Sequence, residues 1–162
     1  MSAAVSPIPP GYHTLTPHIV VSDAKKAADF YQKAFGAEVR GMAEAPDGVV
    51  IHAEVKIGDS ILMFNEEVRH VGVLSPNSTK ASTCVTLHMY VKDADKAFAA
   101  AVAAGAKVIM PLEDQFWGDR YGTVEDPFGH RWSIATHIKD MSPEQMKTAM
   151  DEAIAKMSAT HS

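Results

Sequence analysis

The segment best equipped for chemistry is the stretch Gln115–Arg120, which places an amide, two aromatic rings, a carboxylate and a guanidinium next to a glycine. Trp117 could stack on a planar or cationic ligand. Arg120 could hold a carboxylate or phosphate through two parallel hydrogen bonds, and Gln115 could fix the ligand's orientation. The alternative is that Trp117 plugs the mouth of a barrel while Asp119 and Arg120 pair with each other or with the backbone. We predict that Gln115, Trp117, Asp119 and Arg120 bind a ligand.

Two histidines occupy equivalent places in an internal repeat. Residues 16–27 (TPHIVVSDAKKA) return as residues 86–97 (TLHMYVKDADKA), which places His18 and His88 at matching positions. Repeated modules usually pair about a pseudo-twofold axis, so both histidines are expected to line the floor of one shared cleft. The alternative is that each imidazole is only hydrogen-bonded across the module interface.

The elements that must position these residues follow the order βαβββ twice. A strand precedes each helix, Asp23 and Asp93 are N-caps, and Gly36 and Gly105 end the helices. Alternating and β-branched runs predict the strands. The predicted strands are 15–21, 39–44, 49–57, 60–65, 85–91, 107–111, 120–125 and 130–137.

Three further segments complete the chain. Residues 1–13 read as an extended arm, and residues 66–82 read as the linker between modules. Ser142 and Gln145 form a capping box that begins a last helix, whose apolar stripe should pack on a sheet or on a partner chain. We expect a single domain over 1–140, with modules at about 12–66 and 83–138, followed by a C-terminal helix and tail over 141–162.

Composition excludes several classes of function. The formal charge of −5 argues against nucleic-acid binding. No apolar run is long enough to span a bilayer, so no membrane partner is expected. Cys84 is the only cysteine and is expected to be a structural thiol, which fits a reducing compartment. With no leader pattern at the N-terminus, we expect a cytoplasmic protein.

The repeat resembles the tandem βαβββ modules of the vicinal oxygen chelate superfamily, which includes glyoxalase I, extradiol dioxygenases and bleomycin resistance proteins. Its PhnB-like branch is the most similar. The resemblance implies an α+β fold of two incomplete barrels around a shared cleft, and it implies a homodimer. It is carried by residues 16–21 (TPHIVV), 30–37 (FYQKAFGA), 57–63 (IGDSILM), 114–122 (DQFWGDRYG) and 126–133 (DPFGHRWS).

The resemblance also raises the question of a metal. Metal-using members hold one divalent ion with His, Glu or Gln side chains from the first and last strands of each module, leaving positions open for substrate. The matching positions here are Thr16, Met63, Thr86 and Ser133, none of which is a usual ligand for such an ion. We therefore expect no cofactor. The alternative is one divalent metal ion at a displaced site formed by His18, His88 and His137.

These patterns predict a small-molecule-binding protein that captures a small organic molecule reversibly, without the usual metal. Trp117 would stack on the ligand, Arg120 and Gln115 would fix its polar groups, and His18 and His88 would line the floor. The alternative is a metal-dependent lyase, isomerase or dioxygenase of the glyoxalase type that uses the displaced histidines.

Overall fold

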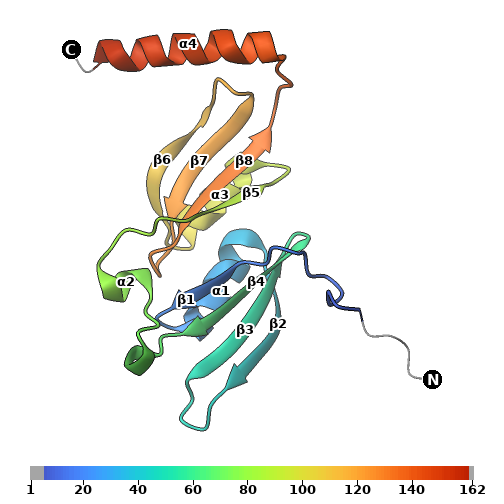
Figure 1. Cartoon of the computed structure of the whole chain (residues 1–162), viewed down its shortest axis with the longest axis vertical. Helices are drawn as coiled ribbons and strands as arrows, with labels where there is room; N and C mark the ends of the chain where they lie inside the picture. Colours follow the sequence, from blue (N-terminus) through green and yellow to red (C-terminus); the bar gives the residue numbers. More distant parts are fainter. Residues whose placement is uncertain (1–5, 161–162) are drawn as a thin grey trace.

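The computed structural model describes residues 6–160, so the first five residues of the predicted arm and the last two of the tail lie outside it. The described chain folds into two four-stranded sheets, each with a helix packed on one face (Figure 1). The α+β class that the resemblance implied is therefore confirmed.

The first module is a mixed sheet in the order β1-β4-β3-β2. β1 runs parallel to β4, and the remaining pairs are antiparallel. Asp23 caps the helix as predicted, because its carboxylate accepts the Lys26 N–H at 2.9 Å. The elements are β1 (His18–Val21), α1 (Ala24–Phe35), β2 (Glu38–Glu44), β3 (Val50–Ile57) and β4 (Ser60–Glu66).

The second module repeats this plan with the order β5-β8-β7-β6. Asp93 caps its helix through the Lys96 N–H at 2.9 Å. The strand predicted at 107–111 continues to Asp114, so the predicted loop after it is reduced to a tight turn. In the first module, the strand predicted at 15–21 is shorter and begins at His18. The elements are β5 (Thr86–Tyr90), α3 (Ala94–Ala103), β6 (Lys107–Asp114), β7 (Asp119–Glu125) and β8 (Arg131–His137).

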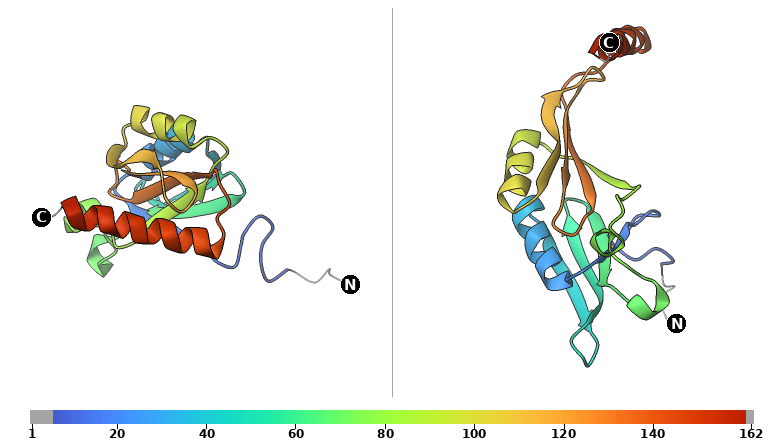
Figure 2. Two further views of the ribbon diagram at one scale, coloured as in Figure 1. Left: turned by 90° about the horizontal axis from the view of Figure 1, so that it is seen from above. Right: turned by 90° about the vertical axis from the view of Figure 1, so that its left-hand side faces the viewer.

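The two modules meet side by side. Helices α1 and α3 contact each other, and Figure 2 (right) shows both helices on one side of the molecule with the two sheets on the other. The face of each sheet that its own helix does not cover is called here its open face. Strand register places His18 beside Met63 and His88 beside Ser133, so the two histidines are structurally equivalent.

A buried carboxylate joins the modules through the core. Asp126 accepts hydrogen bonds of 2.9 Å from the Tyr31 hydroxyl of α1 and from the Trp132 indole of β8. It also accepts the backbone N–H groups of Phe128 and His130, so it caps its own turn. Four donors on one buried carboxylate fix the relative position of α1 and β8.

The linker is more ordered than a simple connector. It contains η1 (Arg69–Val71) and α2 (Pro76–Thr79). The nearly buried Glu67 accepts the Ser75 N–H at 3.0 Å and pairs with Arg69 at 2.6 Å. The linker is thereby folded back on itself beneath the second module.

The last helix, α4 (Pro143–Thr160), extends from the far end of the second module and stands away from both sheets (Figures 1 and 2). The capping box is confirmed, since Ser142 and Gln145 exchange hydrogen bonds of 2.9 and 3.2 Å. The stripe does not pack on a sheet of its own chain, and Met150, Ile154 and Met157 are exposed. Within residues 6–160, no helix has the length and apolar character needed to cross a membrane.

Candidate functional site

The open face of the second sheet carries a group of polar and aromatic side chains. Register sets Tyr90 and Tyr121 on either side of Ala135, and sets His137 beside Asp119, so these residues share one face because strand side chains alternate. We call the group the sheet 2 cluster. Its members are His88, Tyr90, Trp117, Asp119, Tyr121 and His137.

Asp119 is the centre of this cluster. Asp119 is only 4% exposed to solvent. One carboxylate oxygen accepts the Tyr90 hydroxyl at 2.9 Å and the Trp117 indole N–H at 3.1 Å. The other lies 2.8 Å from Nδ1 of His137. Three side chains from different parts of the module are therefore held in fixed positions by one buried anion.

The cluster also fixes charge states. Hydrogen bonding to Asp140, and then to Asp119, raises the pKa of His137 above its ordinary value. Burial alone would raise the pKa of Asp119, but hydrogen bonds from His137, Tyr90 and Trp117 outweigh it and the pKa is lowered. The hydrogen bond to Asp119 raises the pKa of Tyr90, which stays a neutral donor. The carboxylates beside His137 thus favour its protonated form, and the rings around it are neutral.

Aromatic rings continue from this centre across the sheet. His88 lies 6.0 Å from Tyr121 with ring planes 20° apart, and 4.7 Å from Tyr90 in an edge-on arrangement. Tyr121 in turn lies 5.5 Å from Trp117. His88 is also fixed by a 2.7 Å hydrogen bond between its Nδ1 and the Ser133 hydroxyl. These contacts form a continuous wall on which a flat molecule could stack.

The predicted loop residues divide between the two faces of the sheet. Trp117 and Asp119 lie together on the open face, and the Gln115 N–H closes the turn by donating to the Asp119 carbonyl at 2.8 Å. Arg120 points the other way, toward α3. There its guanidinium binds both carboxylate oxygens of Asp95 at 2.6 and 2.7 Å and binds Asp114 at 2.9 Å. Arg120 and Asp119 are thus not paired with each other.

His18 lies in the other module, apart from the sheet 2 cluster. Its Nε2 is 2.8 Å from the Asn65 amide oxygen, and its ring is 6.2 Å from His52. His52 is 2.9 Å from Glu54. Hydrogen bonds from Tyr12 and then His52 lower the pKa of Glu54, so the arm residue Tyr12 reaches this open face.

The structure does not bring the displaced metal ligands to one point. His88 and His137 share a face but have separate partners, and His18 belongs to the first sheet. Among residues 6–160, no group of three His, Cys, Asp or Glu side chains is placed to hold an ion. At two of the four family positions the hydroxyls have other partners: Thr16 donates to the His13 carbonyl, and Ser133 is hydrogen-bonded to His88. The side chains present therefore do not fit the usual divalent site.

Two members of the cluster were missed by the sequence analysis. Tyr90 follows His88 at the alternating position of the same strand, and Tyr121 follows Asp119 in the same way. The signal was the two-residue period, which places each tyrosine on the face of its predicted neighbour. The role of His137 as a partner of Asp119 depends on strand pairing, which the sequence does not display.

Comparison with known proteins agrees with the fold. The model of the Glyoxalase/Bleomycin resistance protein/Dioxygenase superfamily matches residues 12–134. An uncharacterized protein of Mycobacterium bovis, Mb0911c, is 44% identical over 138 residues, which are 84% of this chain and 91% of that protein. Because the family model matches most of the chain, this protein belongs to the glyoxalase/bleomycin resistance protein/dioxygenase superfamily.

Solved structures support the same assignment. TioX from Micromonospora sp. ML1 superposes with a TM-score of 0.61 at 28% identity, covering 76% of this chain and 98% of TioX. A PhnB protein from Bacillus cereus, described as a putative 3-demethylubiquinone-9 3-methyltransferase, superposes with a TM-score of 0.59 at 18% identity, covering 76% of this chain and 99% of that one. The second likeness shows the fold alone.

Proposed function

We propose that this protein binds a small organic molecule reversibly against the open face of the second sheet. The observation that carries the proposal is the convergence of Tyr90, Trp117 and His137 on the buried carboxylate of Asp119. A surface whose rings are already held in place loses little conformational entropy when a ligand binds. Stability alone does not require such a buried anion, because apolar side chains would fill the same space without a desolvation cost.

The shape of the cluster favours a planar ligand. The nearly parallel rings of His88 and Tyr121 and the exposed ring of Tyr90 offer flat apolar surfaces. A planar ring system would match these surfaces. Arg120 does not contact the ligand in this proposal. It supports the sheet from the other face, because its salt bridges to Asp95 and Asp114 hold β6 and β7 against α3.

In this proposal the ligand is captured without a resident metal ion. The support is chemical: Thr16, Met63, Thr86 and Ser133 replace the usual ligands, and Ser133 serves to orient His88. Membership of the PhnB-like branch is proposed from the sequence segments quoted above. The fold of the Bacillus cereus PhnB protein is similar to that of this chain. A cytoplasmic location and a homodimer are proposed with it.

A thermal-shift screen tests the proposal. Protein treated with chelator and then freed of it would be heated with members of a panel of planar heteroaromatic compounds. A true ligand at 100 times its Kd stabilises by about 2.7 kcal/mol and raises the Tm by several degrees. His88→Ala should abolish this shift, whereas His70→Ala, an exposed histidine of the linker, should leave it intact.

Two results would contradict the proposal. The first is that no member of the panel shifts the Tm, and the second is that the shift survives His88→Ala unchanged. Elemental analysis of the protein as purified, without added metal, distinguishes the metal-dependent enzyme. About one divalent ion per chain would favour that class, and it would direct attention to His18, His88 and His137.

A further inference from the structure

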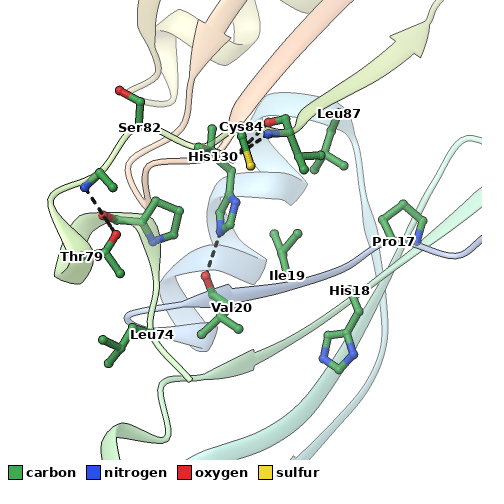
Figure 3. Close-up of a pocket in the computed structure, with 14 residues that line it drawn as sticks. Pro17, His18, Ile19, Val20, Leu74, Thr79, Ser82, Cys84, Leu87 and His130 are labelled. Atoms are coloured by element: carbon green, nitrogen blue, oxygen red, sulfur yellow. Dashed lines mark hydrogen bonds between the residues drawn. The ribbon is translucent and has the colours of Figure 1, made fainter. Parts of the chain in front are cut away.

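A hollow of about 410 Å³ lies where the two modules and the linker meet (Figure 3). β1 forms one wall, the linker from Leu74 to Val85 forms another, and Leu87 and His130 of the second module close it. We call it the junction hollow. Its volume lies within the range of about 300–1,000 Å³ that is typical of small-molecule sites. Of the residues predicted to bind a ligand, only His18 lines it.

The chemistry of the junction hollow differs from that of the sheet 2 cluster. None of its lining residues is Asp, Glu, Lys or Arg. Ile19, Leu74, Val85 and Leu87 supply apolar surface to its walls. A charged ligand would lose water here without gaining a counter-charge, which is strongly unfavourable. The hollow therefore selects for a neutral molecule.

The floor of the hollow is rigid. Nε2 of His130 lies 2.8 Å from the Val20 carbonyl, so this nitrogen is the donor and the imidazole ties the second module to the edge of β1. The Asn77 amide donates to the Pro127 carbonyl at 2.8 Å. A Cβ on Gly129 would lie 2.7 Å from Oδ1 of Asn77, so the hairpin and α2 are in close contact. Linker and hairpin thus hold the walls apart without a ligand.

We propose that the junction hollow is a second binding site, separate from the sheet 2 cluster, for a neutral and mainly apolar small molecule. Its walls come from both modules, so occupancy bridges β1, the linker and the second module. Polar groups along its walls, among them the Cys84 thiol and the Ser82 hydroxyl, could contact a carbonyl or hydroxyl on such a molecule.

The neutral fluorophore N-phenyl-1-naphthylamine is the probe that tests this site. Its matched comparator is 8-anilino-1-naphthalenesulfonate, which has the same rings and an added negative charge. We expect the neutral probe to bind with one-to-one stoichiometry and about tenfold or more tighter than the anion, because the hollow offers no counter-charge.

Cys84 provides an independent readout of occupancy. It is the only cysteine of the chain, it is exposed, and it lines the hollow. Saturating neutral probe should slow the reaction of its thiol with 5,5′-dithiobis(2-nitrobenzoate) several-fold. An unchanged rate with bound probe would overturn the proposal, because it would place the probe elsewhere.

Matched variants locate the probe. Val85→Lys puts a charge into the hollow at a residue that is 59% exposed, and Val71→Lys does the same at a residue that is 64% exposed and lies outside it. We expect only Val85→Lys to weaken probe binding, by about tenfold or more. His88→Ala should leave it unchanged, which separates this site from the proposed function. Equal binding of the probe to both lysine variants would overturn the proposal, and so would loss of binding in His88→Ala. A halving of the native mass in Val85→Lys would also overturn it, because it would show that a second copy of the chain covers the hollow.

Discussion

Asp119 determines whether the sheet 2 cluster is a preformed surface or a set of independent side chains. Its carboxylate serves Tyr90, Trp117 and His137 at once while remaining almost inaccessible to water. A buried anion is tolerated only when its oxygens are satisfied, so the three donors and the carboxylate depend on one another. The ligand surface is consequently only as ordered as this one group.

Replacing Asp119 by Asn should therefore loosen the whole cluster. An amide keeps one acceptor oxygen and turns the other into a donor, so at least one present donor loses its partner. The expected cost is about 1–3 kcal/mol of unfolding free energy. The pKa of His137 should fall toward its ordinary value. Urea unfolding and an NMR titration of His137 measure these effects.

Asp140→Asn provides the control. Asp140 is exposed and lies 3.0 Å from Nε2 of His137. Its loss should lower the pKa of His137 as well, but with a change of stability within about 0.5 kcal/mol, as is usual for an exposed position. If Asp119→Asn were as stable as Asp140→Asn, the central role given to Asp119 would be wrong.

Glu67 makes a pH-dependent contribution to the free energy of unfolding. Hydrogen bonds from Ser75 and then Ser78 lower its pKa to about 2. A lowered pKa in the folded state stabilises above the unfolded value of about 4.3, and this contribution is lost as the pH falls toward 2. The contribution is on the order of 3 kcal/mol.

The stability of Glu67→Gln should therefore depend less on pH between about 4.5 and 2 than that of the wild type, while being lower at pH 7. Urea unfolding across this range measures both slopes, with the exposed Glu152→Gln as control. Parallel slopes for Glu67→Gln and the wild type would exclude this carboxylate as a source of acid sensitivity.

Trp117, Asp119 and Arg120 show how far residue-scale prediction reached. Trp117 and Asp119 lie together on the open face of the second sheet. Arg120 belongs to the strand that begins at Asp119, so alternation turns it to the opposite face. The sequence could not reveal that Asp95, in a helix distant along the chain, lies on that opposite face and binds the guanidinium of Arg120.

At the element scale, the turn between β6 and β7 is coupled to the segment that leads into α4. The carbonyl of Gly118 accepts the N–H groups of Ile138 and Lys139 at 2.9 and 3.0 Å. Gly118 has φ of +95°, and a Cβ there would collide with the Lys139 carbonyl. This close approach requires glycine for two independent reasons.

Gly118→Ala should therefore separate the turn from the segment after β8 and disturb the neighbouring Trp117. Gly48→Ala is the matched control, because Gly48 has φ of +87° but nothing within 4 Å of its added Cβ. Both variants incur a cost of about 1 kcal/mol for the left-handed backbone, and Gly118→Ala should lose at least about 1 kcal/mol more. Thermal unfolding compares them, and equal losses would show that the contact is not important.

Elements were the most predictable level of this structure. Caps such as Asp23, Asp93 and the Ser142–Gln145 box act locally, so their signals are complete in the sequence. The linker was not predicted to contain η1 and α2, because its order depends on Glu67 and on the contact between Asn77 and the hairpin. The contact between Asn77 and Pro127 joins segments that are distant along the chain, so no local pattern displays it.

At the scale of the whole molecule, the repeat predicted the paired modules but not where their ligand surfaces would lie. The six predicted binding residues do not converge on one cleft within a single chain, and only His18 reaches the junction hollow. The apolar stripe of α4 is likewise exposed at Met150, Ile154 and Met157. Both observations are explained if a second copy completes the assembly, as the proposed homodimer requires.

Ile154→Glu tests the role of α4 in that assembly. Ile154 is 50% exposed on the stripe, and the neighbouring Ala155 is exposed on another face of the same helix. We expect light scattering to show a dimer for the wild type and for Ala155→Glu, and about a tenfold or larger weakening of dimerisation for Ile154→Glu. A dimer unaffected by Ile154→Glu would assign the interface to other surfaces, and a monomeric wild type would contradict the dimer itself.

The measurement that tests the central claim most directly is a ¹⁵N NMR titration that follows the two indole N–H groups of the chain. Trp117 lies in the sheet 2 cluster and Trp132 lies in the core, so one reports the proposed site and the other is an internal control. Titration of the metal-free protein with the planar compounds found by thermal shift should move the Trp117 resonance in a saturable manner and leave Trp132 in place. A ligand that stabilises the protein without moving the Trp117 resonance would contradict binding at the sheet 2 cluster.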